Sequence, residues 1–137
     1  PNFLPFIAGF ELQFGRHRYF FRGGETPFNN GGSISVATNK YCMNKKLHKA
    51  GFPVCKTNAF NQDEFKKASI DTLLDGLNFP LVVKPTRDTG VGYDVICNIQ
   101  TPEELIESME DRFKRHEFLS IEEFHKGMNS YRVLVFH

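Results

Sequence analysis

The stretch FPLVVKPTRDTGVGYDV, residues 79–95, decides how the rest of the chain is interpreted. It begins with an apolar run typical of a buried strand, and this run ends at Lys84 and Pro85. A short segment that carries Gly90 and Gly92 follows, and then a second apolar run. A strand-end lysine beside glycines can hold a phosphate, because glycines let backbone N–H groups approach closely. Many ordinary strands also end in a lysine, so the stretch alone leaves both interpretations open.

The composition is that of a soluble globular protein. The 137 residues are enough for one domain with a core, and 40% of them are hydrophobic. The net charge of +1 argues against a nucleic-acid partner, because the basic residues are matched by acids. No apolar run approaches the about 20 residues that cross a bilayer, so we expect no membrane partner. The 15 phenylalanines predict a core rich in aromatic side chains.

The cysteines and the N-terminus bear on the cellular compartment. Cys42, Cys55 and Cys97 are scattered and form no CxxC pair, so the sequence supports neither a disulfide framework nor a zinc site. No signal peptide opens the chain, and Pro1 in place of methionine suggests a fragment or a processed product. We therefore expect a cytoplasmic protein.

The first 34 residues are expected to form a segment of their own. Residues 10–14 and 18–22 alternate in polarity and predict two strands joined by a turn. Residues 23–33 are rich in glycine and asparagine and predict a loop. We therefore expect a leading β-hairpin and loop over residues 1–34, followed by the main domain over residues 35–137.

Helices and strands are expected to mix along the main domain. Its helix signals include a possible N-cap at Thr38, a capping box at Asn61 and Glu64, and an apolar stripe of Leu105, Met109 and Phe113. The predicted helices span residues 37–50, 61–77 and 101–116, and the predicted strands span residues 52–60, 79–84, 93–99, 118–124 and 130–136. The predicted class is α+β, with helices packed on one face of a mostly antiparallel sheet.

Three common nucleotide-binding loops do not match the chain. The Walker string G-x-x-x-x-G-K-[ST] is absent. A protein kinase places its glycine loop before the strand lysine, whereas Lys84 precedes Gly90 and Gly92. A Rossmann turn leads from a strand into a helix, whereas residues 93–99 are predicted as a strand. The remaining design is a glycine-rich hairpin that covers phosphates from one side.

Several segments, in one order, resemble an ATP-grasp enzyme of the carboxylate–amine ligases, such as cyanophycin synthetase and the ATP-grasp part of bifunctional glutathione synthetase. The resembling segments are LQFGRHR (12–18), ATNKYCMNKKLHKAGFPVCK (37–56), FPLVVKP (79–85), TRDTGVGYDV (86–95) and SIEEFHKGMNSYRVLVF (120–136). Each segment is a weak signal alone, and their common order makes the resemblance specific over residues 11–137.

The resemblance implies an ATP-grasp small lobe whose lysines and glycine-rich hairpin bind the phosphates of ATP. Lys40 and Lys84 are expected at the α- and β-phosphates, where each charge-assisted contact contributes about 1.5–3 kcal/mol. Lysine suits a phosphate that moves during a reaction, because its ammonium is a movable point charge. Thr89, Gly90 and Gly92 are expected to bring the backbone of the hairpin to the β- and γ-phosphates.

The resemblance also implies an adenine hinge in the segment that begins at Glu122. The Glu122 carboxylate is expected to accept a hydrogen bond from the adenine amino group. The backbone of Glu123, Phe124 and His125 is expected to contact the rest of the ring edge.

Residues after the hinge complete the expected nucleotide site. Asn129 or Ser130 is expected at the ribose hydroxyls, although the resembling enzymes usually have an acid there and a turn one residue shorter. Arg132 is expected to face the phosphates or a substrate carboxylate.

The resemblance implies that ATP activates a carboxylate as an acyl phosphate, from which an amine displaces phosphate to form an amide or peptide bond. The expected partners are ATP, Mg²⁺, small-molecule carboxylate and amine substrates and further copies of the chain in a homo-oligomer. Mg²⁺ takes hard oxygen ligands, and no Asp or Glu follows Glu123. We therefore expect the magnesium ligands outside this chain, residues 35–137 to be the N-terminal part of an ATP-grasp domain, and the fragment alone to be inactive.

Each of these features also has an ordinary explanation. Lys84 can be a strand-end lysine whose head group reaches water, Lys40 a helix-surface charge, and the glycines a tight hairpin turn. Arg16, Arg18 and Arg22 can be a substrate-facing strip or a solvated hairpin. The alternative function is that of a stand-alone, non-catalytic nucleotide-binding or interaction module.

Overall fold

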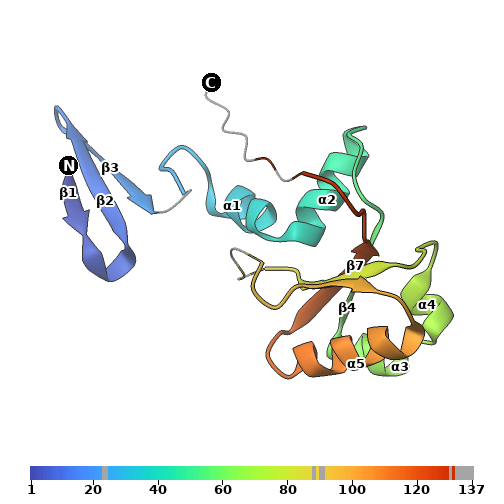
Figure 1. Cartoon of the computed structure of the whole chain (residues 1–137). Coiled ribbons are helices and arrows are strands. Elements are labelled where there is room, and N and C mark those ends of the chain that lie inside the picture. The colour runs from blue at the N-terminus through green and yellow to red at the C-terminus, as the bar shows by residue number, and fades with distance from the viewer. Residues whose placement is uncertain (23–24, 88, 90–91, 130, 132–137) are drawn as a thin grey trace.

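The computed structural model of the chain describes residues 1–22, 25–87, 89, 92–129 and 131. These residues form two β-sheets, one with three strands and one with four (Figure 1). The first sheet contains β1 (Asn2–Leu4), β2 (Gly9–Phe14) and β3 (His17–Arg22), with a short 3-10 helix, η1 (Pro5–Ile7), after β1. The second sheet contains β4 (Thr57–Asn61), β5 (Leu81–Pro85), β6 (Ile96–Ile99) and β7 (Phe118–Glu123).

The four-stranded sheet has the order β4-β7-β5-β6, and all its neighbouring strands are antiparallel. β5 and β6 are paired as the hairpin that the sequence predicts around the glycine-rich segment. β7 lies between β4 and β5, and its register pairs Ser120 with Lys84 and Glu122 with Thr57. The predicted α+β class with a mostly antiparallel sheet is therefore confirmed.

Helices lie on both sides of this sheet (Figure 1). On one side are α3 (Gln62–Lys67), α4 (Ile70–Leu74) and α5 (Pro102–Phe113), and on the other are α1 (Gly31–Thr38) and α2 (Lys40–Lys49). The core of the described residues lies on the side of α3, α4 and α5, but the prediction that helices pack on one face alone was wrong, because α2 contacts β4 from the other side. No helix of the described ranges is long and apolar enough to cross a membrane.

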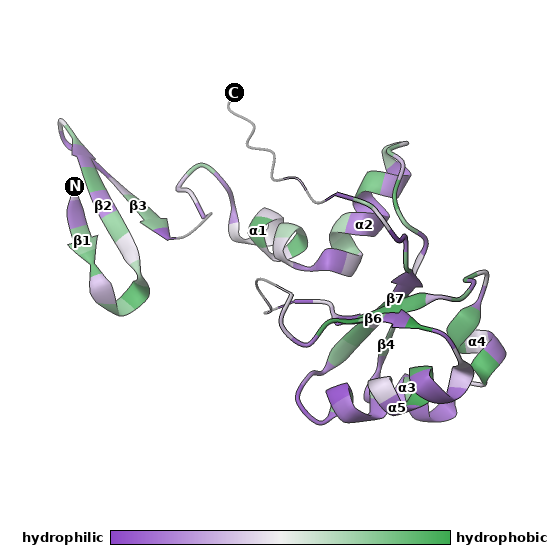
Figure 2. Ribbon diagram, viewed as in Figure 1, coloured by the Kyte–Doolittle hydropathy of each residue, from purple (hydrophilic) through white to green (hydrophobic). Residues whose placement is uncertain are grey.

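The core of the domain joins α5 to the four-stranded sheet. Leu105, Met109 and Phe113, the stripe predicted from the sequence, are all buried. They pack with alternate residues of β5 and β7, which point to the same face because side chains alternate along a strand: Leu81, Val83, Leu119 and Ile121. In Figure 2 the ribbon of α5 is largely hydrophilic, as expected for a helix with one buried stripe.

The segment predicted as a loop over residues 23–33 contains the start of a helix. Asn30 caps α1, because its side chain accepts a hydrogen bond from Ser33 N at 2.8 Å. Asn39, and not Thr38, caps α2 and accepts from Cys42 N at 2.9 Å. The prediction was wrong here because the asparagines were interpreted as loop formers, whereas asparagine is also among the strongest N-caps.

The helix predicted over residues 61–77 is divided into α3 and α4. The capping box of Asn61 and Glu64 is present, as predicted. Ala68 is extended at ψ 137, and Ser69 caps α4 by accepting from Thr72 N at 3.2 Å. A second strong N-cap inside an apolar pattern therefore ends one helix and starts another.

The strand boundaries differ in part from the prediction. β4 and β6 begin several residues later than predicted, at Thr57 and Ile96. The strand predicted over residues 130–136 lies outside the described residues, apart from Tyr131. α1 crosses residue 34, so the boundary predicted there falls within a helix, and the division of the chain at that point stays a prediction.

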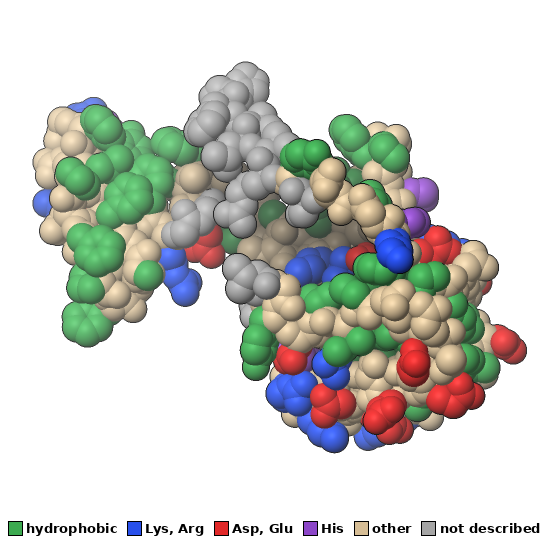
Figure 3. Space-filling view, viewed as in Figure 1, with side chains coloured by type: hydrophobic (Ala, Val, Ile, Leu, Met, Phe, Trp, Pro, Cys, Tyr) green, Lys and Arg blue, Asp and Glu red, His purple; other side chains and the backbone are tan. Residues whose placement is uncertain are grey.

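The expectation that phenylalanine fills the core holds beside α5, where Phe113 is buried and three partly buried phenylalanines pack against the core, and was wrong for the N-terminal part of the chain. Phe113 belongs to the core, whereas several phenylalanines of the three-stranded sheet and its surroundings are exposed: Phe3, Phe6, Phe10, Phe14, Phe20 and Phe28. Figure 3 shows their hydrophobic surface on this part of the molecule. A sheet buries side chains only where a second layer covers it, and the described residues place no such layer on these rings.

The core assignment predicts different costs for two adjacent substitutions in α5. Leu105 is 0% exposed and Ile106 is 38% exposed. Leu105→Ala is expected to lower the free energy of unfolding by about 2–5 kcal/mol, because it leaves a cavity in the core. Ile106→Ala is expected to cost less than about 1 kcal/mol. Urea denaturation followed by circular dichroism measures both values, and equal losses would contradict this packing.

Candidate functional site

The face of the four-stranded sheet opposite the α5 core carries a charged pair. Lys84 on β5 and Glu122 on β7 form an ion pair between Nζ and Oε1, with side chains only 22% and 16% exposed. Residues two positions apart on a strand share a face, which separates this pair from the buried apolar residues on the other face. A partly buried pair is screened less by solvent than a surface pair.

Polar groups from α2 and β4 hold the Glu122 end of this pair. Thr57 Oγ1 lies 3.5 Å from Glu122 Oε2. The side-chain amide of Asn44 donates to Thr57 Oγ1 at 3.2 Å and to the Cys55 carbonyl at 2.9 Å. Asn44 and Thr57 were not predicted from the sequence, because only the pairing of β4 with β7 brings them to Glu122.

Lys40, in the first turn of α2, reaches the carboxyl end of β5. Its backbone N–H donates to the Thr86 carbonyl at 2.7 Å. Its Nζ lies 3.2 Å from the Pro85 carbonyl oxygen and 3.0 Å from Thr89 Oγ1. The fold therefore brings the two predicted phosphate-binding lysines to neighbouring positions at the carboxyl end of β5.

The structure gives Glu122 a contact that its predicted role did not include. Its carboxylate pairs with Lys84, so a nucleotide phosphate at Lys84 and an adenine amino group at Glu122 would each compete with this ion pair. An anion that binds at Lys84 therefore meets an ammonium whose charge is already paired with the Glu122 carboxylate. The predicted contact of Glu122 with adenine stays a prediction.

Glu123 points away from this pair, toward the turn before β5. Its Oε1 accepts from both the backbone N–H and the side-chain amide of Asn78, each at 2.9 Å. These hydrogen bonds, with that of the side-chain amide the larger, hold the pKa of the Glu123 carboxyl below its usual value. Glu123 therefore connects the end of β7 to the entrance of β5.

The backbone of the predicted hinge is partly engaged within the protein. The Phe124 N–H donates to the Pro80 carbonyl at 2.8 Å, so this donor extends the pairing of β7 with β5. His125 and Asn129 follow as exposed residues. The Phe124 N–H can meet an adenine ring only if its contact with Pro80 is broken, which was not anticipated from the sequence.

Three of the predicted site residues lie outside the described part of the chain: Gly90, Ser130 and Arg132. Gly92 is described, and its φ of 80° lies in the left-handed region that favours glycine. A side chain at this position would meet no atom of the described residues within 4 Å, so the left-handed backbone is the feature that favours glycine here. Thr89 therefore lies beside Lys40, and Gly92 lies four residues before the start of β6.

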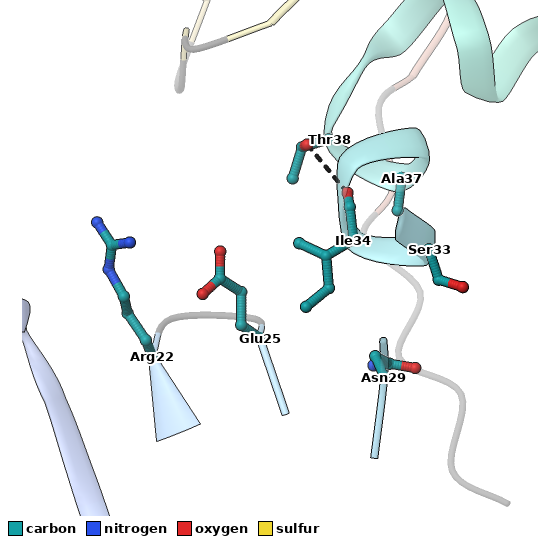
Figure 4. A pocket seen from close by; sticks show the side chains of 7 residues that line it. All are labelled: Arg22, Glu25, Asn29, Ser33, Ile34, Ala37 and Thr38. Atoms are coloured by element: carbon teal, nitrogen blue, oxygen red, sulfur yellow. Dashed lines mark hydrogen bonds between the residues drawn. The ribbon is translucent and has the colours of Figure 1, made fainter. Parts of the chain in front are cut away.

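The three arginines named as a possible substrate strip are not equivalent. Arg18 pairs with Glu11 of the neighbouring strand at 3.5 Å. Arg22 lines a cavity of about 570 Å³ between β3 and α1, together with Glu25, Asn29, Ser33, Ile34, Ala37 and Thr38. Figure 4 shows the side chains of Arg22 and Glu25 extending in the same direction beside Ile34. Neither predicted phosphate lysine lines this cavity, so its chemistry is separate from theirs.

The described residues contain no group of three or more His, Cys, Asp or Glu side chains that could hold a metal ion. They therefore offer no all-protein cage for an ion, whereas Mg²⁺ at a nucleotide is usually held by one or two carboxylates together with the phosphates. Lys40 and Lys84, the two lysines predicted at the phosphates, both lie within the described part of the chain.

Comparisons with solved structures found ligases. D-alanine–D-alanine ligase from Helicobacter pylori superposes with a TM-score of 0.58 and 24% identity. D-alanine–D-alanine ligase from Bacillus anthracis superposes with a TM-score of 0.55 and 29% identity. VanG D-Ala:D-Ser ligase from Enterococcus faecalis superposes with a TM-score of 0.58 and 25% identity. The matches cover 70%, 67% and 68% of this chain. No protein-family model and no curated protein sequence matches the chain.

The matches cover only part of each ligase. This chain spans 28% of the H. pylori enzyme, 29% of the B. anthracis enzyme and 26% of VanG. PurK, N5-carboxyaminoimidazole ribonucleotide synthetase, matches with a TM-score of 0.50 and 19% identity, which bears on the fold alone. All of these proteins are ATP-grasp ligases, and their likeness does not extend to the narrower resemblance to cyanophycin and glutathione synthetases.

The contact of Glu123 with Asn78 predicts a pH-dependent contribution to stability. The pKa of Glu123 is lower in the folded chain than its usual value of 4.5, so its contribution is present above the unfolded-state pKa. The contribution is lost as the pH falls through the lower, folded-state pKa. Glu123→Gln is therefore expected to destabilise the protein at pH 7, and the difference from the wild type is expected to shrink in acid.

Thermal or urea denaturation of the two proteins at a series of pH values measures this difference. Glu107→Gln, at an exposed position of α5, is the matched control and is expected to show little effect at any pH. A difference between Glu123→Gln and the wild type that stays constant down to strong acid would contradict the assigned contact.

Proposed function

Given an α+β fold shared with ATP-grasp ligases, we propose that this chain is the nucleotide-binding small lobe and hinge of an ATP-dependent ligase. The observation that carries the proposal is the position of Lys40, which reaches the carboxyl end of β5 beside Lys84. One of the B. anthracis ligase structures that the chain resembles is a complex with ATP, at 28% identity. The reaction proposed is the formation of an amide or peptide bond through an acyl phosphate.

Lys84 and Lys40 are proposed to bind the phosphates. Each ammonium now contacts protein oxygens, so binding exchanges these contacts for phosphate oxygens. A triphosphate carries more negative charge than a single carboxylate, and each charge-assisted contact contributes about 1.5–3 kcal/mol. The displaced Glu122 carboxylate is then available to the adenine amino group. In this sequence of events, Lys84 and Glu122 keep each other neutralised until the nucleotide arrives.

In the proposed reaction, the main task of the site is to stabilise negative charge on the phosphate oxygens. A carboxylate oxygen of one substrate attacks the γ-phosphorus and ADP leaves, which forms the acyl phosphate. The amine of the second substrate then attacks the carbonyl carbon and phosphate leaves. The lysines are proposed to stabilise the negative charge that develops on the phosphate oxygens during the first step. Mg²⁺, when bound, would supply further neutralisation from ligands other than those described here.

The chain spans less than a third of the ligases that it resembles, so the activity of a whole enzyme is part of the proposal. Residues 35–137 are proposed as the N-terminal part of the ATP-grasp domain and residues 1–34 as the segment that precedes it. We further propose a cytoplasmic homo-oligomer that acts on small-molecule carboxylate and amine substrates.

Substitution of the β5 lysine tests the proposal directly. Lys84→Ala is expected to weaken ATP binding by about 10–100-fold, because one charge-assisted contact is lost. Calorimetry on the protein that carries this chain measures the affinity. Lys66→Ala, on the exposed side of α3, is the control and is expected to leave the affinity unchanged.

A second variant separates the lost phosphate contact from an uncompensated Glu122. Lys84→Ala leaves the Glu122 carboxylate without its lysine, which by itself can disturb the sheet. The double variant Lys84→Ala/Glu122→Gln removes that charge and is expected to bind ATP as weakly as Lys84→Ala or more weakly. Wild-type affinity in either Lys84 variant would refute the phosphate assignment, and binding without turnover in the whole protein would favour a non-catalytic module.

A further inference from the structure

The turn between α5 and β7 contacts the chain on both sides of the glycine-rich segment. Arg115 and His116 of this turn contact Asp94, and Glu117 contacts Arg87. Asp94 lies two residues after Gly92, whereas Arg87 lies two residues before Thr89. We refer to Asp94, Arg115 and His116 together as the loop anchor.

Asp94 makes the most extensive of these contacts. The Arg115 guanidinium donates to both carboxylate oxygens, from Nε to Oδ2 and from a terminal nitrogen to Oδ1, each at 3.2 Å. His116 Nε2 lies 2.7 Å from Oδ2. The Asp94 side chain is only 12% exposed, and these partners, Arg115 first, hold the pKa of its carboxyl below the usual value. A bidentate arginine fixes the orientation of a carboxylate as well as its position.

The backbone at Asp94 needs this support. Its φ of 56° is left-handed, which is uncommon for any residue except glycine, asparagine and aspartate. Gly92, two residues earlier, is also left-handed at φ 80°. The pairing of β5 with β6 does little to fix this backbone. It is irregular, and its register pairs only Leu81 with Ile99 and Val83 with Ile96. Side-chain contacts from another part of the chain therefore fix the backbone that follows Gly92.

The contact on the other side of the segment is weaker. Arg87 donates to Glu117 Oε2 at 3.2 Å, but both side chains are largely exposed, and such pairs contribute little. The Arg87 guanidinium also lies over the ring of Phe118, 5.9 Å from its centroid. The loop anchor at Asp94 is therefore the stronger restraint of the two.

We propose that the loop anchor positions the backbone of Gly92 for phosphate binding, which makes Asp94, Arg115 and His116 positioning residues of the nucleotide site. This inference rests on the proposed function, since it assigns the anchor to the same phosphates that Lys40 and Lys84 bind. Backbone donors aid an anion only when they are held in place before it arrives, and a mobile backbone loses entropy on binding. The anchor contacts no nucleotide group itself and acts through the segment that it holds.

The proposal predicts a loss that depends on the phosphates of the ligand. Asp94→Asn keeps a side chain that tolerates the left-handed backbone and removes the charge that holds Arg115 and His116. ATP binding is expected to weaken by about tenfold, corresponding to about 1.4 kcal/mol. Adenosine, which lacks phosphates, is expected to bind as it does to the wild type. A purely structural role would weaken both ligands together, so the comparison of ATP with adenosine separates the two roles.

Asp111→Asn is the matched control for this comparison. Asp111 also bonds to Arg115, at 3.1 Å, but from within α5, and its hydrogen bonds among the described residues all go to Arg112, Lys114 and Arg115. The control therefore removes the same kind of charge from the same arginine, and it is expected to leave ATP affinity within about twofold of the wild type. Calorimetry or ligand-observed NMR with ATP and adenosine, on the protein that carries this chain, measures all of these affinities.

A second variant of the loop anchor allows the proposal to be tested even if Asp94→Asn does not fold. Arg115→Lys keeps the positive charge but loses the bidentate geometry. It is expected to weaken ATP binding without changing adenosine binding, and by less than Asp94→Asn does. The inference is overturned if both variants bind ATP as the wild type does while Lys84→Ala does not, or if ATP and adenosine affinities fall in parallel. If the wild type binds no ATP, the proposed function fails first, and this inference fails with it.

Discussion

The ion pair of Lys84 with Glu122 is the interaction on which the rest of the site depends. Each side chain is partly buried, and a partly buried charge without a partner is costly, so the two strands that carry them must stay in register. β7 therefore lies beside β5, and β4 pairs with its other edge. Through Thr57 and Asn44 the same pair is connected to α2. The first turn of α2 in turn carries Lys40 to the end of β5, so one pair organises both candidate phosphate ligands.

The alternation of side chains along β5 and β7 lets one sheet serve two purposes. The residues on one face bury α5 and provide most of the hydrophobic stabilisation. The other face carries the buried Val82 and Ser120 and, beside them, the partly exposed Lys84 and Glu122 of the candidate site. A one-residue slip in register would move charges into the core and apolar side chains into the site, so the stability of the core and the geometry of the site select the same pairing.

The features that the sequence predicts well are local ones. The stripe of α5, the capping box at Asn61 and the β5–β6 hairpin all follow from residues close together in the chain. Local signals also misled, since asparagine starts a helix at Asn30 where a loop was predicted. The Lys84–Glu122 pair and the loop anchor join residues 38 and about 21 positions apart, so they depend on tertiary packing that no periodicity reveals. The roles of the lysines could be proposed only because several weak segments occur in one order.

The most direct test of the account is to map where ATP binds, by following backbone amide and lysine side-chain NMR signals during a titration. The account predicts the largest shifts at Lys40, Lys84, Thr89 and Glu122, with the Lys84 ammonium signal changing as its partner changes from carboxylate to phosphate. The signals of α3, on the opposite face of the sheet, are expected to stay in place. Shifts confined to the residues that line the cavity between β3 and α1, with Lys84 unaffected, would contradict the central claim that the charged face of this sheet is a phosphate site.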